Sequence, residues 1–441
     1  MATRTGTSRR GFLSRGLLAG AALGLGAEVM SHRGARAQAA PNARLGIGFI
    51  GIGGMGRAHV DRLCADQRFE IVGLCEVDSS RLQSAAEKIT AERGHTPFTT
   101  TDYHELLDQP GLDAVLIASP DHWHATHAIH AVRAAKHVYV EKPVTHDLEE
   151  GRRLVEEVAK SDVVVQVGTH HRASRGIQAT AEIVRSGQLG EIRRAWAWKE
   201  PRWLNPADET AQRNRANPAQ LDWDRWLGPS PDLAFDPNRA HYAWRYFWDQ
   251  GGGLMTDWGV HQLDIALWAL RPKRLLSVEA RGTRWAESPM EVPYAQHARF
   301  EFDGLSLEWQ QGLDMEKDPE GLMQDNGIAF IGSEASLYFT FGRMPVVYPD
   351  TFDLQEVADD IKIPVRGSHY DDWLACIADR SLTPLAPVYE AHWTTTVCTL
   401  GNIGYRVGGK LDWDTDRERF VDSQQGNYLI GHHARAPYTI D

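Results

Sequence analysis

A glycine-rich turn between two apolar runs constrains the fold of this chain most. Residues 45–50 are apolar and predict a buried strand, and a helix is predicted from about Met55. Three glycines join them with the spacing G-x-G-x-x-G: Gly51, Gly53 and Gly56. A second apolar run, 69–78, carries Glu76 near its end, twenty residues after the last glycine. Strand, glycine turn, helix and strand make a βαβ unit, so the two strands are expected to be parallel.

This arrangement predicts a dinucleotide site. Glycines let the backbone approach a pyrophosphate, and the helix start offers it unpaired N–H groups and a positive dipole end. The Glu76 carboxylate can accept hydrogen bonds from ribose hydroxyls and would repel a 2′-phosphate, so NAD is predicted over NADP. Arg81 could swing towards that phosphate and weaken the preference. The cofactor residues predicted from this unit are Gly51, Gly53, Gly54, Met55, Gly56 and Glu76.

β-Branched runs and amphipathic helices then alternate up to about residue 168. Strands are predicted at 113–119, 137–142 and 163–168, and helices at 79–94, 122–136 and 147–161. Such alternation indicates an α/β domain, here residues 40–168, with a parallel sheet covered on both faces. Ligands bind at the carboxyl ends of such strands. The further cofactor residues predicted near these ends are Ser119, His124, Glu141 and Lys142.

The histidines and cysteines do not indicate a metal site. His124 and His127 are spaced i, i+3, but no carboxylate or thiolate joins them at helical spacing. We interpret them, with His122 and His130, as residues that line the cofactor crevice and the helix surface. The four cysteines form no C-x-x-C pair and are predicted to be buried free thiols: Cys64, Cys75, Cys376 and Cys398.

The stretch 251–268, GGGLMTDWGVHQLDIALW, places ionisable groups at the start of an apolar helix. Asp257 and His261 are four residues apart and share a helical face, with Asp264 one turn further on. Either Asp257 caps the helix and His261 is a satisfied polar neighbour, or both face a reaction centre. Hydride transfer from an alcohol needs a base and a group that holds the oxygen. His261 or Lys142 could take the proton, Asp257 could orient His261 or bind hydroxyls, and Lys142 could polarise the oxygen.

Three segments together resemble the Gfo/Idh/MocA oxidoreductases, which include inositol dehydrogenases, glucose-fructose oxidoreductase and NAD-dependent glycosidases. They are GFIGIGGMGRAHV, SPDHWHATHAIHAVRAAKHVYVEKPVT and GGGLMTDWGVHQLDIALW, and the resemblance covers residues 44–441. It implies that Lys142, Asp257 and His261 surround the carbon that gives up hydride. It also implies an N-terminal Rossmann domain, a C-terminal α+β domain with a large, mostly antiparallel sheet, and a homo-oligomer, dimer or tetramer.

The pattern after residue 168 differs from the first domain. Six segments between 191 and 341 alternate apolar and polar residues, as in an antiparallel sheet, and helices are predicted at 368–379 and 388–407. Residues 169–441 are therefore predicted to form a domain for substrate binding and oligomerisation.

Residues 198–250 of that second domain are rich in aromatic side chains: Trp198, Trp203, Trp223, Trp226, Tyr242, Trp244, Tyr246, Phe247 and Trp248. They either pin an irregular loop to the core or stack on sugar rings, and both can hold for different residues. Arg172 and Arg245 could bind hydroxyls. The substrate residues predicted are Arg172, Tyr242, Arg245, Asp257 and His261.

The N-terminal segment predicts export. The pair Arg9 and Arg10 precedes a weakly apolar Gly/Ala-rich stretch, and Ala37 and Ala39 have the spacing of an A-x-A cleavage site. Residues 1–39 are thus predicted to be a twin-arginine signal peptide of a periplasmic or otherwise exported protein. Without their six arginines and one acid, 41 basic and 58 acidic side chains give a net charge of −17. This argues against nucleic acid and anionic membranes as partners, and no other apolar run is long enough to span a membrane.

These features favour an NAD(P)-dependent oxidoreductase that acts on a carbohydrate or polyol hydroxyl. Because no ordinary pool of NAD exists outside the cytoplasm, its cofactor is expected to stay bound and to be recycled internally. The first alternative is an NAD-dependent glycoside hydrolase that works through a transient 3-keto sugar. The second is a sugar or dinucleotide sensor without turnover, against which the presence of Lys142, Asp257 and His261 argues.

Overall fold

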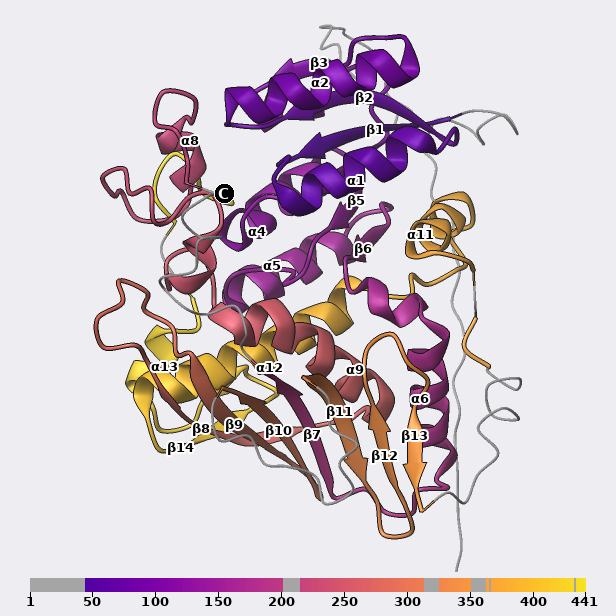
Figure 1. Cartoon of the computed structure of the whole chain (residues 1–441), viewed down its shortest axis with the longest axis vertical. Helices are drawn as coiled ribbons and strands as arrows, with labels where there is room; N and C mark the ends of the chain where they lie inside the picture. Colours follow the sequence, from indigo (N-terminus) through magenta and orange to yellow (C-terminus); the bar gives the residue numbers. More distant parts are fainter. Residues whose placement is uncertain (1–43, 201–214, 313–324, 350–361, 365, 432–433) are drawn as a thin grey trace, which may run out of the picture. The chain divides into compact units, whose positions relative to one another are not determined.

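The computed structural model describes most of the chain that follows the predicted signal peptide. The described ranges are 44–200, 215–312, 325–349, 362–364, 366–431 and 434–441. The predicted signal peptide and Trp203 lie outside them. Two sheets organise the described residues, one of six strands and one of nine (Figure 1).

The six-stranded sheet is parallel, with the order β3-β2-β1-β4-β5-β6. Its strands are β1 (Leu45–Ile50), β2 (Phe69–Cys75), β3 (Phe98–Thr100), β4 (Ala114–Ile117), β5 (His137–Val140) and β6 (Val165–Val167). Its helices are α1 (Gly54–Ala65), α2 (Ser79–Arg93), α3 (Tyr103–Leu107), α4 (Asp121–Arg133) and α5 (Leu148–Ala159). This is the Rossmann order, which reverses between β1 and β4, and it confirms the predicted domain. The prediction missed β3 and α3, which are too short to show a periodic pattern.

Apolar side chains cover both faces of this sheet. Phe49 and Ile71 pack under α1 and α2, while Val115 packs under α4 and α5 on the other face. Helix α11 (His369–Ala378) also joins the first face, where Trp373 is fully buried against these residues. Although α11 belongs to the second predicted domain by sequence, it packs on this sheet, because an apolar helix face packs wherever an uncovered sheet face lies.

The nine-stranded sheet has the order β13-β12-β11-β7-β10-β9-β8-β14-β15. Its strands are β7 (Arg194–Lys199), β8 (Leu275–Thr283), β9 (Ala295–Phe302), β10 (Leu305–Gln311), β11 (Asn326–Ile331), β12 (Ser336–Phe339), β13 (Val346–Tyr348), β14 (Lys410–Asp414) and β15 (Arg419–Phe420). Only the pair β7 and β10 is parallel among the pairs described. The predicted large, mostly antiparallel sheet is therefore confirmed.

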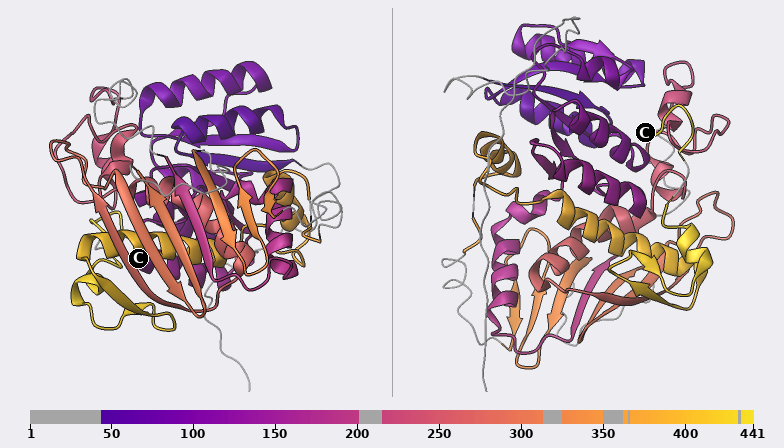
Figure 2. Two further views of the ribbon diagram at one scale, coloured as in Figure 1. Left: turned by 60° about the horizontal axis from the view of Figure 1, so that its bottom comes forward. Right: turned by 180° about the vertical axis from the view of Figure 1, so that it is seen from behind.

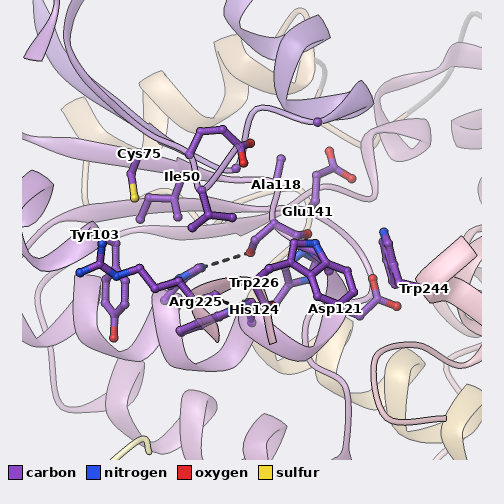
Figure 3. A pocket seen from close by; sticks show the side chains of 18 of the residues that line it. Ile50, Cys75, Tyr103, Ala118, Asp121, His124, Glu141, Arg225, Trp226 and Trp244 are labelled. Carbon is purple, nitrogen blue, oxygen red and sulfur yellow. Dashed lines mark hydrogen bonds between the residues drawn. The ribbon is translucent and has the colours of Figure 1, made fainter. Parts of the chain in front are cut away.

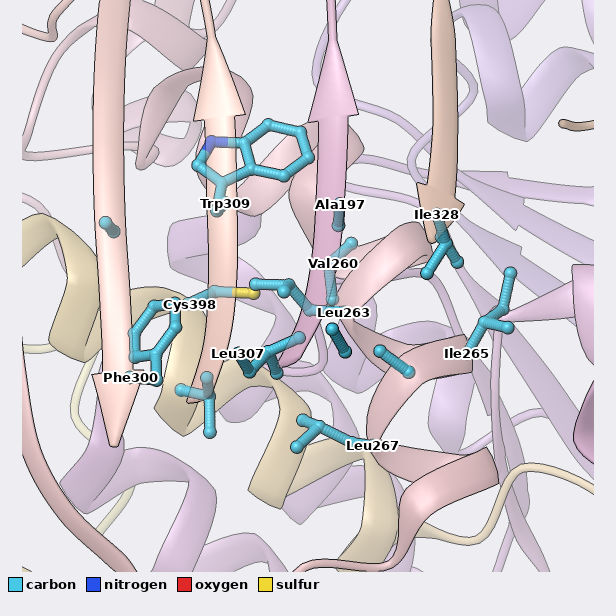
Figure 4. Close-up of a cluster of buried hydrophobic side chains, with 14 of the residues drawn as sticks. Ala197, Val260, Leu263, Ile265, Leu267, Phe300, Leu307, Trp309, Ile328 and Cys398 are labelled. Atoms are coloured by element: carbon cyan, nitrogen blue, oxygen red, sulfur yellow. The ribbon is translucent and has the colours of Figure 1, made fainter. Parts of the chain in front are cut away.

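Helices α6 (Arg175–Ser186), α9 (Val260–Leu270) and α12 (Val388–Val407) contact this sheet (Figures 1 and 2). The core between them includes Phe300, Trp309 and Leu263, all fully buried (Figure 4). Burial of each such side chain contributes about 1.5–3 kcal/mol. Gly401 lets α12 approach, since a Cβ there would lie 2.7 Å from the Met255 side chain.

The remaining described elements are short: η1 (His170–Ala173), α8 (Trp223–Leu227), η2 (Ala243–Tyr246), the π-helical turn η3 (Met255–Gly259) and α13 (Gln424–Tyr428). Capping boxes begin two of the predicted helices. Asp147 and Glu150 cap α5, and Ser368 and Asp371 cap α11. In each pair, the two side chains satisfy backbone N–H groups that the first helical turn leaves unpaired.

All four cysteines are described, buried and free, as predicted. Within the described ranges, no helix combines the length and the apolar character that crossing a bilayer requires. The same ranges hold no group of three or more His, Cys, Asp and Glu side chains arranged to bind a metal ion.

Candidate active site

One cavity of about 800 Å³ lies along the carboxyl ends of the parallel strands. Figure 3 shows Cys75 and Tyr103 at one end, here called the Tyr103 end, and Asp121 and Trp244 at the other, the Asp121 end. The predicted residues that line the cavity are Gly51, Gly53, Gly54, Met55, Glu76, Ser119, His124, Glu141, Lys142, Tyr242, Arg245 and Asp257. The structure thus gathers most of the predicted cofactor and substrate residues around one space.

The glycine turn leaves room where a dinucleotide would approach. Gly51 has a φ of +83°, and a Cβ there would lie 2.6 Å from the Ser119 backbone nitrogen. A Cβ on Gly56 would lie 2.0 Å from the Gly51 carbonyl oxygen, so this glycine lets α1 pack onto the turn. Gly54, by contrast, has nothing within 4 Å of its Cβ position. Two glycines therefore shape the turn, and open space remains at the helix start that would bind a pyrophosphate.

Glu76 is held at the end of β2 by backbone N–H groups. Its two carboxyl oxygens accept hydrogen bonds from Ile52 N (2.6 Å) and Asp78 N (2.9 Å). Burial raises the pKa of the Glu76 carboxyl, and the two backbone donors partly oppose this effect. A fixed acceptor at this position suits the ribose hydroxyls of a dinucleotide. Arg81 lines the same cavity, so the preference for NAD over NADP stays a prediction.

His124 connects two loops at the cavity wall. Its Nδ1 lies 2.6 Å from the Pro143 carbonyl oxygen, and its Nε2 lies 2.8 Å from the Ser119 carbonyl oxygen. Burial lowers the pKa of His124, so the ring is neutral and can donate to only one of these oxygens. His124 therefore positions Ser119 and the loop after β5 while it lines the cavity.

Glu141 is anchored from behind the cavity. Its Oε1 lies 2.9 Å from His59 Nε2, and the other His59 nitrogen contacts the Tyr370 hydroxyl. Burial favours a high pKa for Glu141, but His59 and Lys142 outweigh burial and lower this pKa to about 2. An ionised Glu141, bonded to groups behind the wall, fixes the position from which the next residue, Lys142, extends.

Lys142, from the domain of the parallel sheet, and Asp257, from the domain of the nine-stranded sheet, form an ion pair. Lys142 Nζ donates to Asp257 Oδ1 at 2.7 Å and to the Asp257 carbonyl oxygen at 3.0 Å. Arg245 Nε lies 3.8 Å from the other Asp257 carboxyl oxygen. Burial acts to raise the pKa of Asp257, but Lys142 and Arg245 lower it overall, so the carboxylate is ionised. One ammonium, one guanidinium and one carboxylate thus face the cavity together, which suits a polyhydroxylated ligand.

The start of the helix 251–270 differs from the regular helix that the spacing of Asp257 and His261 predicts. Met255–Gly259 form a π-helical turn, a feature often found at functional sites. The Asp257 side chain bonds Lys142 and makes no helix-capping hydrogen bond. It therefore does not cap the helix, and it contacts Lys142 and not His261, because the half-buried carboxylate pairs with the nearest cation. Of its two predicted roles, binding of neighbouring hydroxyls stays a prediction.

His261 lies beside the cavity and is not among the residues that line it. Its ring packs edge-on against His171 at 4.7 Å and near His170 at 5.7 Å. Its Nδ1 is buried and has no hydrogen-bond partner among the described residues. Burial, followed by Lys142 and the two neighbouring histidines, lowers the pKa of His261 well below its ordinary value. The ring is therefore neutral, and because its Nδ1 lacks a partner it is not the satisfied polar neighbour of the alternative interpretation.

Two family models match almost the whole of the described chain. One is an oxidoreductase family with an NAD-binding Rossmann fold, matched by residues 45–169. The other is the C-terminal alpha/beta domain of the same oxidoreductase family, matched by residues 190–440. This chain belongs to the Gfo/Idh/MocA oxidoreductase family. The match confirms the resemblance and the prediction that the first domain binds NAD.

Individual members of the family cover a range of activities. Myo-inositol 2-dehydrogenase of Thermotoga maritima is 32% identical over 145 residues, which are 33% of this chain and 42% of that protein. Alpha-N-acetylgalactosaminidase of Shewanella oneidensis is 29% identical over 150 residues, 33% of each chain. The chain thus matches less than half the length of these curated relatives.

Solved structures share the fold of this chain over a longer range. A WlbA dehydrogenase from Chromobacterium violaceum, in complex with NADH and UDP-GlcNAcA, has a TM-score of 0.64 at 17% identity and covers 85% of this chain and 97% of its own. Levoglucosan dehydrogenase in complex with NADH and levoglucosan has a TM-score of 0.61 at 18% identity, with 84% and 99% covered. At such low identity the likeness extends to the fold alone.

The predicted role of Arg172 in binding substrate hydroxyls is wrong. Its guanidinium is buried, donates to both Asp264 oxygens at 2.6 and 2.7 Å, and also pairs with Glu390. Burial opposes the charge, but Asp264 and Glu390 raise the pKa of Arg172 overall. Because its donors are used inside the protein, Arg172 connects η1 to α9 and α12 and does not bind substrate.

Some aromatic residues of the segment 198–250 line the cavity and others are buried in the core. Each of the two interpretations therefore holds for some of them. Trp226, Tyr242 and Trp244 line the cavity, whereas Tyr246 and Phe247 are buried in the core, as is Trp198 of β7. The Arg245 guanidinium lies 4.3 Å from the Trp244 ring centre and 5.1 Å from that of Tyr242. Stacking of this kind restricts the arginine and presents a flat apolar and charged surface to the cavity.

The histidines of α4 also occupy two kinds of position. His124, His127 and His130 line the cavity, as predicted, while His122 is fully buried and bonds the Trp226 carbonyl oxygen at 3.0 Å. Burial lowers the pKa of all four, that of His122 to about 3. They are therefore neutral side chains at neutral pH.

Several parts of the cavity wall were not among the predicted site residues, and Asp121, Arg225 and the segment after residue 436 are three of them. Asp121 begins α4 and is buried at the cavity, where burial raises its pKa well above the ordinary value. Its place after the strand 113–119 was the signal that could have identified it. Arg225, and residues 437–441 far along the chain, also line the cavity, and no local pattern in the sequence points to them.

Proposed function

We propose that this family member is an exported NAD-dependent oxidoreductase that acts on a hydroxyl of a carbohydrate or polyol and recycles a bound cofactor. The observation that carries the proposal is the Lys142–Asp257 pair, which lies in the same cavity as the glycine turn. Sugar and inositol dehydrogenases among the relatives support the substrate class. The predicted signal peptide supports the exported location.

In the proposed reaction, Lys142 binds the reacting oxygen. Its ammonium already donates to two oxygens of Asp257, so a substrate hydroxyl can take the place of one of them. Asp257 and Arg245 then bind neighbouring hydroxyls, and Trp244 packs against the sugar ring. The hydroxyl proton passes to the neutral His261, or to Lys142 once its ammonium has given up a proton, as the C–H electron pair leaves the carbon. When bound, NAD supplies the acceptor for that hydride.

A closed cofactor cycle follows from the proposed location. An exported protein has no ordinary supply of free NAD, so a dinucleotide that left the site would be lost. The hydride taken from one carbon is therefore returned to a carbonyl, either of the same sugar or of a second one. The net reaction is then sugar–sugar oxidoreduction, epimerisation or assisted bond cleavage, with no net NADH released.

The second candidate is glycoside cleavage through a transient 3-keto sugar. Oxidation at C3 acidifies the C2 hydrogen, elimination expels the group at C1, water adds, and the returned hydride restores the C3 hydroxyl. Asp121 favours this candidate, because a buried carboxyl with a raised pKa holds a proton that an expelled oxygen needs. The similarity to an alpha-N-acetylgalactosaminidase supports it as well.

One experiment tests both candidates. Purified protein is dialysed, its bound dinucleotide is identified after denaturation, and native protein is given free sugars and glycosides without added NAD. Many turnovers without net NADH support the closed cycle, and a released aglycone selects the glycosidase. Turnover that stops after one equivalent and resumes only with free NAD contradicts the cycle. No reaction with any sugar, while sugars still bind, would favour the sensor.

We also propose that the protein is a homo-oligomer, a dimer or tetramer. Among the described residues, β13 is the outermost strand at one end of the large sheet. Met344 just before it, and Val346 and Tyr348 within it, are exposed apolar side chains, at 44%, 46% and 54%. Such an edge favours association. Light scattering during size-exclusion chromatography measures the mass, and a monomer at micromolar concentration would contradict this proposal.

A further inference from the structure

Residues 434–441 form one wall of the cavity. Pro437, Tyr438, Thr439 and Asp441 line the same space as Gly53 and Glu76. Figure 1 shows this end of the chain between α4 of the first sheet and α8. The segment follows α13 in the sequence, more than 300 residues after the glycine turn. Although residues 434–441 lie far from the glycine turn in the sequence, they close one side of the cavity in which the cofactor is predicted to bind. This position indicates a role for the segment in cofactor binding.

The wall is attached to the segment 224–229 by polar contacts. Arg435 donates to Asp224 Oδ1 at 2.6 Å and to the Gly228 carbonyl oxygen at 3.1 Å. The Tyr438 hydroxyl donates to Asp224 Oδ2 at 2.6 Å. Arg435 N also donates to the Pro229 carbonyl oxygen at 3.1 Å. Both oxygens of one carboxylate thus hold the wall in place.

On its other side, the wall meets the first domain. The Tyr438 ring packs edge-on against Trp123 of α4 at 5.4 Å, and Arg133 bonds the Ile440 carbonyl oxygen. Tyr438 and Ile440 are only partly buried against the core of this domain. The wall therefore bridges two parts of the molecule through partly exposed contacts.

These contacts place the wall at the Tyr103 end of the cavity. Trp123, which Tyr438 touches, packs against Tyr103 at 5.8 Å. Tyr103 begins α3 directly after β3, and β3 pairs with β2, the strand that leads to Glu76. Glu76 is the residue that fits the adenosine ribose. The wall thus stands beside the adenosine half of the site, away from the Lys142–Asp257 pair.

We propose that residues 434–441 close over the adenosine half of bound NAD and control how fast the cofactor leaves. Exposed ion pairs are individually weak, so the segment can open without unfolding either domain. Release then requires opening first, and the observed rate scales with the open fraction. The proposal rests on the NAD site, and it gives the closed cycle proposed above a physical means of retaining the cofactor.

Release of the dinucleotide tests the proposal directly. Protein loaded with NADH is mixed with excess NAD, and the loss of bound-NADH fluorescence gives the release rate. Tyr438→Ala and Asp224→Ala should each accelerate release about threefold or more, because each removes partly exposed contacts that hold the wall closed. Tyr428→Ala is the matched control, since Tyr428 is a tyrosine that is 76% exposed on α13. It should release NADH at the wild-type rate.

Further variants separate the proposal from a folding defect. Tyr438→Phe keeps the ring and loses only the hydroxyl, so it should release NADH faster than wild type and more slowly than Tyr438→Ala. The double variant Tyr438→Phe/Asp224→Ala should release it no faster than Asp224→Ala alone, because the hydroxyl acts through Asp224. Thermal unfolding of each dinucleotide-free variant checks that the fold is intact.

Unchanged release in both Asp224→Ala and Tyr438→Phe would overturn the proposal. This result does not depend on turnover. A wild-type protein that stops after one equivalent would contradict the closed cycle, while the ratio of release rates between variant and wild type would still decide the role of the wall.

Discussion

Replacement of Lys142 by methionine should remove catalysis while the cofactor stays bound. The change deletes the 2.7 Å bond to Asp257 Oδ1 and the 3.0 Å bond to its carbonyl oxygen, and it keeps most of the side-chain volume. Only Arg245, at 3.8 Å, then remains near the Asp257 carboxylate. Loss of a positioned acid–base group reduces turnover by about a hundredfold or more. We expect at least this loss with a bound dinucleotide stoichiometry equal to wild type.

The same replacement has a calculable effect on stability. A hydrogen bond to a charged group contributes about 1.5–3 kcal/mol. The Lys142 and Asp257 side chains are 13% and 27% exposed, and Arg245 still neutralises the carboxylate in part, so the lower value applies. We expect urea unfolding to show a loss of about 1.5 kcal/mol at pH 7.

The pH dependence of this loss has a definite sign. In the wild type the pKa of Asp257 is lowered, so its contribution to stability is present above the ordinary value of 3.8 and is lost as the pH falls through the folded-state pKa. Without Lys142, burial should raise the pKa of Asp257. The destabilisation should therefore be smaller at pH 4 than at pH 7.

A double variant separates the two effects. Lys142→Met/Asp257→Asn removes the uncompensated charge, so it should be more stable than Lys142→Met and equally inactive. Turnover is measured with the sugar identified by the substrate panel, and the bound dinucleotide is quantified after denaturation. Near-normal turnover of Lys142→Met would refute the catalytic assignment. Equal stability of the single and double variants would refute the pairing argument.

Three further predictions follow from buried charges and neutral rings. Arg172→Met should lower the free energy of unfolding by about 3–5 kcal/mol, because it leaves Asp264 buried and unpaired; a raised KM with unchanged stability would instead make Arg172 a substrate ligand. Lowering the pH from 7 to 5 should lower the free energy of unfolding by about 2 kcal/mol for each of His122 and His171. Their folded pKa values of about 3 lie below the unfolded value of 6.5, so the unfolded state binds more protons below pH 6.5; a stability that is flat over this range would show that the two rings are not held neutral in the folded protein. Glu76→Ala should bring the dissociation constants of NAD and NADP closer together in titration calorimetry, and an unchanged ratio would show that Glu76 does not select the cofactor.

The local sequence pattern was enough to predict most strands and helices of the first domain and an antiparallel sheet in the second. The strand 45–50, the glycine turn and Glu76 depend on neighbours in the sequence, and the structure contains all three as predicted. The strands β3, β13 and β15, of three, three and two residues, are too short to show a period. The place of α11 on the first domain could not be predicted, because its apolar face specifies burial but not against which sheet.

In the candidate site, too, single residues could be predicted from the local sequence, but their long-range contacts could not. Lys142 and Asp257 each stood out locally, but their contact joins residues 115 positions apart, and only the family resemblance implied it. Arg172 was predicted to bind hydroxyls because its partners could not be identified from the sequence: Asp264 and Glu390 lie on two later helices. A charged residue is assigned reliably from sequence only when its partners are known.

The buried ion pair of Arg172 and Asp264 explains how Lys142 and Asp257 are positioned. Asp257 and Asp264 lie on one continuous helical segment, one facing the cavity and the other fully buried. The bidentate Arg172–Asp264 pair fixes this segment to η1, which directly follows β6 of the parallel sheet. Lys142 extends from the end of β5, which pairs with β6. The buried ion pair therefore connects the helix that carries Asp257 to the sheet that carries Lys142, and sets the distance at which the two meet. Such support behind a reactive pair is what keeps it in a productive geometry.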